Sequence, residues 1–340
     1  MKKRKITASI LLTTVALVSS AFMAGCADNS SQAVNSSQTE NSSQTESSQT
    51  ESSTETEDTQ QAVTFTDALG REITVESADR VASLLGSFSE VWILAGGELV
   101  ASVDDAWKSF DFNLSDDTVK LGAILEPNTE LLIASKPDFV IASSNTEPDV
   151  ALCETLENAG ITVAYFDVNT FDDYLKMLDI CTDITGRKDL YETNGTSVRA
   201  EIEKAKARID GSSPEVLLLR AASKNVKVKG SDDTVGGTIL KDLGCVNIAD
   251  SDESLIDDLS LEAIVKADPD YIFVMVQGSD IDAALKNVDT MLRDNPAWSS
   301  LTAVKNDRYY VLDKALYTLK PNNKWGESYT KMADILYPER

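Results

Sequence analysis

Short apolar runs alternate with segments of helical periodicity along the chain from residue 62 onward. Runs that are apolar at nearly every position are typical of parallel strands buried on both faces, whereas 63–67 and 72–75 alternate around a glycine turn and predict a β-hairpin. The other predicted strands are residues 80–85, 99–103, 139–142, 162–166, 215–220, 246–248, 271–274 and 308–312. The predicted helices are residues 88–95, 150–159, 236–243, 281–291 and 325–336, together with a helical stretch over 171–209 that divides at Gly186 and leaves a second helix over about 188–209.

One pattern of fourteen residues occurs twice, at 129–142 and again 132 positions later at 261–274. Each copy has a glutamate near the start of a short helix, Glu130 or Glu262, and a Pro-Asp pair that ends the helix before an apolar run. Proline ends a helix because it lacks an N–H and disfavours the α conformation of the residue before it. Two copies at a domain-sized separation predict two similar α/β lobes.

The order of the predicted elements indicates the fold class and the domain limits. Strands and helices alternate through residues 62–187 and again through 211–340, so each part is predicted to be a lobe with a parallel, helix-covered sheet. The helix within residues 188–210 is the only major connection between the lobes, and a closing helix ends the second lobe. A single long, rigid connection predicts limited domain closure around a ligand cleft between the lobes.

The first 61 residues have the composition of an export signal followed by a tether. Basic residues at positions 2–5 precede a mostly apolar stretch and the sequence Ala-Gly-Cys at 24–26, which resembles a bacterial lipobox. Residues 1–25 are therefore predicted to be a lipoprotein signal peptide, and Cys26 the lipidated residue that anchors the protein in the lipid bilayer on the outer face of the cell membrane. Residues 26–61 are mainly Ser, Gln, Thr, Glu and Asn, a composition that predicts a disordered tether.

Charge and residue usage exclude several kinds of partner and site. The formal net charge is −25, of which residues 1–26 contribute +4 and residues 27–61 contribute −7, so residues 62–340 carry −22. Such an acidic surface argues against nucleic acid as a partner, and an anionic ligand would need positive groups inside its pocket. The chain has no histidine, which removes the commonest ligand of zinc and copper and the commonest proton shuttle.

The usual catalytic and metal-binding motifs are missing from the sequence as well. It contains no Gly-x-Ser-x-Gly, no phosphate loop and no metal-ligand spacing, so we expect no catalytic residues, no metal site and no intrinsic cofactor. Asp104 and Asp105 are adjacent and point apart on an extended segment, so they do not form a catalytic pair by themselves. Cys153, Cys181 and Cys245 lie in contexts that favour buried thiols, and a Cys153–Cys181 disulfide is the alternative.

Several segments together resemble the class III substrate-binding proteins of ABC importers, the receptors for ferric siderophores, haem and vitamin B12. The resemblance covers residues 62–340 and rests on 66–71, 79–81, 295–310 and both copies of the repeat. It implies a monomer that delivers a small metal chelate to a permease dimer with its ATPase. It also implies that Glu130 and Glu262 dock into arginine-containing pockets of the permease. The alternative is that each glutamate only complements a helix N-terminus.

Ligands of open α/β sheets bind beyond the carboxyl ends of the strands, so facing loops of the two lobes form the predicted ligand cleft. The candidate residues are Ser87, Phe88, Asp105, Trp107, Ser144 and Asn145 in the first lobe, and Arg220, Lys224, Met275, Gln277 and Tyr317 in the second. Trp107 would supply an aromatic wall and Arg220 a guanidinium for an anionic chelate; the alternatives are packing under a loop and a salt bridge within the lobe. Met275 and Tyr317 are candidate haem ligands, although the apolar run around Met275 favours a core position.

The predicted function is that of an extracytoplasmic receptor that captures an iron chelate and delivers it to an importer. A ferric siderophore ranks before haem, and haem before cobalamin, an order that rests on analogy with the family. An enzyme is not expected. The alternative is a surface lipoprotein that uses the same fold for ligand sensing or adhesion, because a fold by itself does not determine function.

Overall fold

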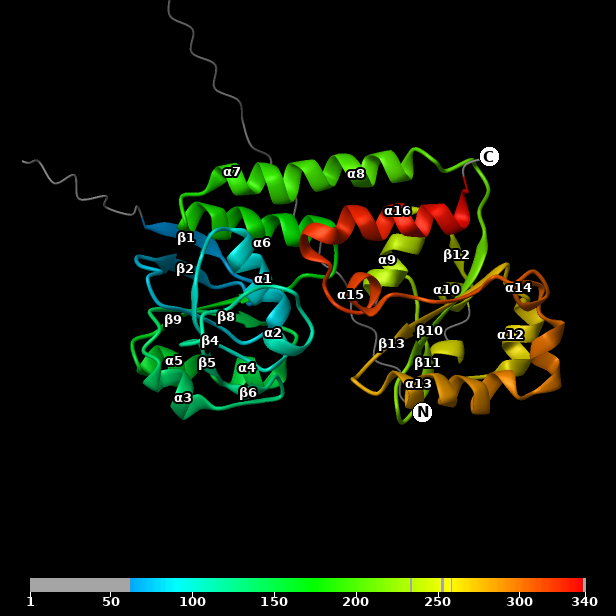
Figure 1. Ribbon diagram of the computed structural model, residues 1–340, viewed down its shortest axis with the longest axis horizontal. Helices are drawn as coiled ribbons and strands as arrows, with labels where there is room; N and C mark the ends of the chain where they lie inside the picture. The colour runs from blue at the N-terminus through cyan, green and yellow to red at the C-terminus, as the bar shows by residue number, and fades with distance from the viewer. Residues whose placement is uncertain (1–61, 233, 252–253, 258, 339–340) are drawn as a thin grey trace, which may run out of the picture. The chain divides into compact units, whose positions relative to one another are not determined.

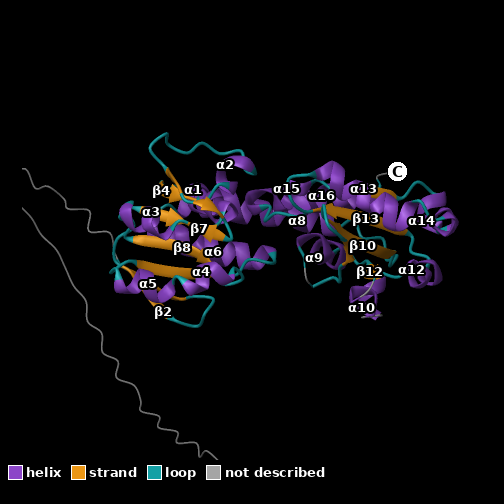
Figure 2. Cartoon of the chain, turned by 90° about the horizontal axis from the view of Figure 1, so that it is seen from below, coloured by secondary structure: helices purple, strands orange, loops and turns teal. Residues whose placement is uncertain are grey.

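Two sheets, each with helices on both faces, form two α/β lobes (Figure 1, and from below in Figure 2). The computed structural model describes residues 62–338 apart from 233, 252–253 and 258. The predicted signal peptide (1–25), Cys26 and the predicted tether (26–61) lie outside the described residues. The α/β class and the two-lobed architecture predicted from the sequence are confirmed.

The sheet of the first lobe is wholly parallel, with the strand order β5-β4-β3-β8-β9. Alternate residues of its central strand β8 (Phe139–Ser143) face opposite helix layers, so Phe139 packs with α1 and α6 whereas Val140 packs with α3 and α5. The elements of this lobe are β1 (Val63–Thr66), β2 (Glu72–Val75), β3 (Val81–Ser83), α1 (Gly86–Leu94), β4 (Leu99–Ser102), α2 (Asp105–Lys108), β5 (Val119–Lys120), β6 (Gly122–Ala123), β7 (Glu126–Pro127), α3 (Thr129–Ala134), β8, α4 (Glu147–Ala151), α5 (Cys153–Asn158), β9 (Thr162–Phe166) and α6 (Phe171–Ile184). The predicted hairpin is present as antiparallel β1 and β2.

The sheet of the second lobe has the order β11-β10-β13-β14, with β12 also paired to β10. Strand β11 runs antiparallel to β10, so the prediction of an entirely parallel sheet is wrong at this edge. The strands are β10 (Glu215–Ala221), β11 (Val226–Val228), β12 (Val246–Asn247), β13 (Tyr271–Val276) and β14 (Tyr309–Val311). The helices are α9 (Val235–Asp242), α10 (Ile248–Ser251), α11 (Ser254–Asp257), α12 (Leu261–Ala267), α13 (Ile281–Val288), η2 (Asp289–Arg293), η3 (Pro296–Ser300), α14 (Thr302–Lys305), α15 (Lys314–Tyr317), η4 (Asn322–Lys324) and α16 (Trp325–Leu336).

The two copies of the repeat make the same connection in each lobe. The backbone N–H of Asp138 donates to the carbonyl of Arg80 at 2.9 Å, and its carboxylate accepts from the backbone N–H of Arg80 at 3.0 Å. Asp270 makes the equivalent pair of bonds with Glu215, at 2.8 and 3.0 Å. The aspartate after each proline therefore fixes the chain entering the first central strand of its lobe. This shared chemistry explains why the pattern repeats.

A continuous helical segment joins the lobes, as the sequence predicts. It consists of α7 (Lys188–Tyr191), a π-helical turn η1 (Glu192–Thr196) and α8 (Ser197–Lys206), and lies beside α6 in Figure 1. A methyl group at Gly195 would come 2.9 Å from the Leu175 side chain of α6. Glycine at this position therefore permits close packing of the connecting helix on the first lobe.

Packing joins the lobes in addition to the chain connection. One apolar cluster contains Phe171 of α6, Ile202 of α8, Leu240 of α9 and the side chains of Trp325 and Tyr329 of α16. The closing helix α16 packs along α8, and its apolar side chains belong to the same cluster as core residues of both lobes. Among the described residues, no helix has the length and apolar character needed to cross a membrane.

Candidate functional site

Two pockets lie where carboxyl ends of strands from both lobes face each other. The first pocket, of about 140 Å³, is lined by Asn169 from the first lobe and by Arg220, Thr234, Val235, Met275, Gln277, Tyr317, Thr318 and Lys320. The second pocket, of about 300 Å³, is lined by Glu90, Lys108, Ser109, Phe110 and Asp111 from the first lobe and by Ala315, Lys320, Pro321 and Lys324. We call the two pockets together the inter-lobe cleft. Their place agrees with the rule for open α/β sheets.

Four candidate residues of the second lobe, Arg220, Met275, Gln277 and Tyr317, line the first pocket. Arg220 is the second-to-last residue of β10. Its side chain is half-buried and has no ion-pair partner among the described residues. Met275 is only 1% exposed and its sulfur lies against Gly236, whereas Tyr317 is 3% exposed and donates its hydroxyl proton to the Ser328 carbonyl at 2.9 Å. Both side chains are therefore engaged in packing, which leaves neither available as a haem ligand in this conformation.

Three candidate residues of the first lobe, Ser87, Phe88 and Asp105, make contacts within the protein around the N-terminus of α1. Phe88 is buried and packs edge-on against Phe166, because the first turn of α1 directs it into the core. The carbonyl of Ser87 accepts from the side-chain amide of Asn322. The carboxylate of Asp105 accepts from the backbone N–H of Gly86 at 3.1 and 3.2 Å, and burial raises its pKa to about 6 although these bonds oppose the shift. The prediction that Phe88 faces a ligand is wrong, because its ring lies in the core. Ligand contact by Ser87 and Asp105, which lie at the N-terminus of α1, stays a prediction.

The remaining candidates lie outside both pockets. Lys120 sits over the ring of Trp107 at 4.9 Å, so one face of the expected aromatic wall is covered, and Phe110 supplies the ring of the second pocket. The hydroxyl of Ser144 donates to the Phe166 carbonyl at 3.3 Å. Asn145 donates to Asp167 at 2.6 Å, and Lys224 is exposed in the turn between β10 and β11.

A buried carboxyl group supports the loop that carries Ser144 and Asn145. Asp149 is fully buried; one carboxylate oxygen accepts from the backbone N–H of Ser143 at 3.0 Å, and the other has no hydrogen-bond partner within the described part of the chain. Burial raises the pKa of Asp149 to about 7 because the single hydrogen bond does not offset the cost of removing a charge from water. This carboxyl group therefore keeps its proton to higher pH than an exposed aspartate does.

Three lysines that line the cleft, Lys108, Lys320 and Lys324, were not predicted from the sequence. Lys320 and Lys324 flank the segment Pro-Asn-Asn, and both line the second pocket. A cation pair around a proline in an acidic chain is the one signal that would have marked this segment. Nothing local in the sequence shows that the segment reaches the opposite lobe.

Asn322 makes the contact that brings this segment to the first lobe. Its side-chain amide donates to the Ser87 carbonyl at 2.9 Å and to the carboxylate of Glu90 at 2.6 Å, and the residue is completely buried. Its backbone is left-handed, with φ 53°, a conformation that asparagine tolerates better than most residues. Burial raises the pKa of Glu90, although the amide of Asn322 and the nearby charge of Lys324 oppose the shift.

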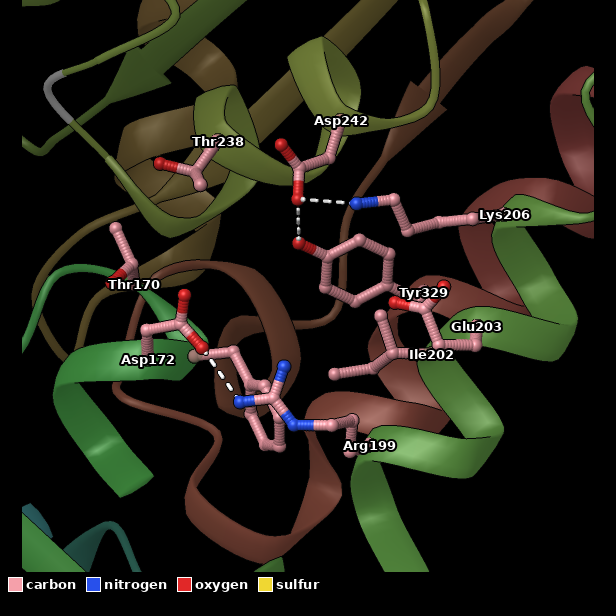
Figure 3. Close-up of a pocket in the computed structure, with 10 residues that line it drawn as sticks. Thr170, Asp172, Arg199, Ile202, Glu203, Lys206, Thr238, Asp242 and Tyr329 are labelled. Carbon is pink, nitrogen blue, oxygen red and sulfur yellow. Dashed lines mark hydrogen bonds and ion pairs between the residues drawn. The ribbon is translucent and has the colours of Figure 1, made fainter. Parts of the chain in front are cut away.

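A third pocket, of about 210 Å³, lies beside the connecting helix and away from the strand ends (Figure 3). Four of its charged side chains form two ion pairs. Arg199 donates to Asp172 at 2.8 Å, and Asp242 accepts from Tyr329 at 2.8 Å and from Lys206 at 3.3 Å. These contacts link α6, α8, α9 and α16, so the side chains of this pocket help to hold the two lobes together. The inter-lobe cleft is therefore the better candidate for the ligand site.

The cysteines are free thiols in the described structure. Cys181 and Cys245 are buried and Cys153 is half-buried, so the alternative of a Cys153–Cys181 disulfide is wrong. Burial raises the pKa of all three thiols. Within the described residues, no group of three or more Asp, Glu, Cys or His side chains is arranged to hold a metal ion.

A protein-family model described as "Periplasmic binding protein" matches residues 81–316, which is more than half of the chain. The chain belongs to the periplasmic binding protein family. The Iron-uptake system-binding protein of Bacillus subtilis is 25% identical over 205 residues, an alignment that spans 58% of this chain and 62% of that relative. The Fe(3+)-citrate-binding protein YfmC of Bacillus subtilis is 27% identical over 283 residues, which cover 79% of this chain and 84% of that relative.

A solved structure agrees with the fold of this periplasmic binding protein. Staphylococcus aureus SirA, complexed with staphyloferrin B, aligns with a TM-score of 0.63 at 20% identity, covering 81% of this chain and 97% of that chain. At this identity the likeness concerns the fold alone. The resemblance to substrate-binding proteins that the sequence motifs indicated is confirmed by the family match.

In this periplasmic binding protein the two repeat glutamates occupy matching places. Glu130 in α3 and Glu262 in α12 are both exposed second residues of their helices. Each helix is capped by the preceding polar side chain, Asn128 in one and Ser260 in the other, so the glutamates are not needed as caps. Leu131, beside Glu130, is 43% exposed and would contribute apolar area to a contact there.

Proposed function

We propose that this protein is the extracytoplasmic receptor of an ABC importer and that it captures a ferric chelate in the inter-lobe cleft. The observation that carries the proposal is the cation-lined cleft at facing strand ends of a periplasmic binding protein. Lys108, Arg220, Lys320 and Lys324 line the two pockets although residues 62–340 are strongly acidic. The names of the iron-uptake and Fe(3+)-citrate relatives support iron as the cargo.

Among the candidate ligands, the geometry favours a ferric siderophore or a related chelate over haem. Haem binding through this cleft would need an apolar slot and an axial ligand. The pockets have volumes of about 140 and 300 Å³ and are rich in charged groups, while Met275 and Tyr317 are both turned into packing contacts. Cobalamin ranks after haem because it is larger still and carries no comparable anionic periphery.

Delivery would use the glutamates of the repeat, and anchoring would use Cys26. Exposed carboxylates in equivalent helices of two lobes would orient the protein on the basic pockets of a permease dimer, whose ATPase supplies the energy of import. A lipidated Cys26 would keep the receptor on the outer face of the cell membrane, at the end of the segment 26–61. We propose a monomer as the working form.

Iron uptake by cells that lack this chain tests the proposal. Cells are grown with iron limited, and uptake of radioactive iron from ferric siderophores, ferric citrate and haem is compared with and without the gene restored. Loss of uptake of one chelate, recovered on restoration, supports the receptor function. Unchanged uptake of every chelate, together with a changed transcriptional or adhesive response to one of them, would favour the sensing or adhesion alternative.

A further inference from the structure

Lys320 occupies the centre of the inter-lobe cleft. It lies in the segment between α15 and η4 and is the one residue, among those that the structure describes, that lines both pockets. Its side chain is half-buried, and its ammonium donates to the amide oxygen of Asn169 on the opposite lobe at 3.1 Å. A ligand that fills both pockets therefore passes this ammonium.

The ammonium of Lys320 has no carboxylate partner among the described residues. Asp167, an acidic residue of the opposite loop, accepts instead from the amides of Asn145 and Asn169 at 2.6 and 2.7 Å. Burial lowers the pKa of Lys320, although the charges of Asp167 and Asp173 oppose the shift. By contrast, Lys188 on the connecting helix has two aspartates at 2.7 Å. The only hydrogen bond of the half-buried Lys320 ammonium among the described residues is to the neutral amide of Asn169, so its charge is available to an anionic group.

The groups around Lys320 extend this positive charge in both directions. Arg220 lies in the first pocket, whose described lining residues include no carboxylate, and Lys108 and Lys324 lie in the second. Two carboxyl groups oppose them in the second pocket, Asp111 and Glu90, and Glu90 is bound to the amide of Asn322 at 2.6 Å. Four cationic side chains and two carboxyl groups thus line the cleft, and of the four cations Lys108 is paired with Asp104 at 2.8 Å.

We propose that Lys320 is the central anion-binding residue of the cleft and that the ligand is a ferric chelate with several anionic oxygen groups, a polycarboxylate or a catecholate, that spans both pockets. The inference rests on the proposed receptor function and narrows its ligand class. Anionic oxygens satisfy an ammonium and a guanidinium by charge-assisted hydrogen bonds, whereas a chelate without net negative charge would leave both cations desolvated and unpaired.

Binding of three chelates of different charge tests this assignment. The protein, purified in mild detergent from cells expressing the full chain, is titrated with ferric citrate, ferric enterobactin and the uncharged ferric trihydroxamate ferrichrome, and tryptophan quenching is followed with corrections for absorption. Lys320→Met and Lys320→Gln remove the charge, Lys320→Arg keeps it, and Lys286→Met removes an exposed lysine elsewhere on the same lobe. Asn169→Ala removes the inter-lobe hydrogen bond but leaves the ammonium.

We expect submicromolar binding of at least one of the two anionic chelates and much weaker binding of ferrichrome. Lys320→Met and Lys320→Gln should lower the affinity for the anionic chelate about 10- to 100-fold, the usual effect of losing a hydrogen bond to a charged group. Lys320→Arg should raise the Kd of the anionic chelate less than about fivefold, and Asn169→Ala should raise it less than Lys320→Met does. Lys286→Met should leave the Kd unchanged. Raising the salt concentration should weaken the anionic chelate in the native protein.

The failures of the two proposals are distinguishable. Tight binding of ferrichrome alone, or an anionic chelate whose Kd is unchanged in both neutral variants, would overturn the assignment of Lys320 and leave the receptor function standing. An equal loss of chelate affinity in Asn169→Ala and Lys320→Met would show that the lysine only connects the two lobes through its hydrogen bond to Asn169. That result would also overturn the assignment of Lys320. Binding of none of the chelates would overturn the receptor function and this inference together.

Discussion

The buried amide of Asn322 offers the sharpest test of how the lobes are held together. Replacing it by glycine preserves the left-handed backbone of φ 53° but removes both hydrogen bonds to the first lobe. The Ser87 carbonyl and the Glu90 carboxylate would then be buried acceptors without donors, each costing about 1–3 kcal/mol. The amide oxygen of Asn322 is itself buried without a partner, so its removal returns part of that cost. We expect the free energy of unfolding to fall by about 3 kcal/mol.

A second substitution at the same position separates the backbone from the side chain. Asn322→Ala loses the same bonds and also forces a residue with a Cβ into the left-handed region, so it should be less stable than Asn322→Gly by roughly 1 kcal/mol. The control is Asn323→Ala, because that neighbour makes only a 3.5 Å contact with Asn194 and should change stability by less than about 0.5 kcal/mol.

Urea unfolding of a form beginning at residue 62, followed by tryptophan fluorescence, gives these free energies. Trp325 follows Lys324 directly and packs in the cluster shared by the lobes, so the signal reports on this region. A loss of less than 0.5 kcal/mol in Asn322→Gly would refute the reasoning, because the inter-lobe hydrogen bonds would then contribute nothing to stability. An alanine variant as stable as the glycine variant would refute the argument from backbone conformation.

Three further predictions concern buried and exposed carboxyl groups and the thiols. The folded protein holds the proton of Asp149 more tightly than the unfolded chain, so stability should fall as the pH rises from about 4 to about 7. Asp149→Asn should remove that fall, so the free energy of unfolding should exceed that of the native protein by about 2–4 kcal/mol at pH 8 and differ little at pH 4. Urea unfolding at both pH values measures the difference, and an equal gain in stability at the two pH values would contradict the prediction. Glu130→Ala with Glu262→Ala should abolish uptake at unchanged ligand affinity, whereas Glu154→Ala, an exposed control, should not; normal uptake in the double variant would end the docking proposal. Cys181 should react with a thiol reagent only after unfolding, and mass spectrometry that finds it oxidised to a disulfide would contradict the free thiol.

The fold could be predicted largely because the repeat combines a helix stop with a buried strand. Pro137 and Pro269 mark both helix ends, and the apolar runs after them become the interior strands β8 and β13 of the two sheets. One detail differed from expectation. The residues before these prolines, Lys136 and Asp268, adopt left-handed rather than extended backbone, with φ 50° and 48°, because they end their helices as caps.

Strand β11 was missed because its signal is short. It contains three residues, 226–228, whose apolar and polar side chains alternate, and it is stabilised as an edge by antiparallel pairing with the end of β10. A segment of this length has no period that can be distinguished from a turn. Its strand conformation comes from the neighbouring strand and therefore from tertiary structure.

The candidate site was predicted at the right edge of the sheets but with only part of its side chains. The rule of strand ends found Arg220, near the carboxyl end of β10, and Gln277, directly after β13. It failed for Phe88, since it locates a loop and not the direction of each side chain, and the first turn of α1 faces the core. It could not find Lys320, because that lysine reaches the cleft through a long-range contact, the burial of Asn322 against the first lobe.

The position of iron in a crystal of the complex tests the central claim most directly. Crystals grown with the chelate that binds most tightly are measured at the iron absorption edge, where anomalous scattering locates the metal without reference to the rest of the ligand. We expect a single iron peak in the inter-lobe cleft, with ligand oxygens within hydrogen-bond distance of Lys320 and Arg220. A peak beside the connecting helix in the pocket of Figure 3, or on the outer surface of either lobe, would contradict it.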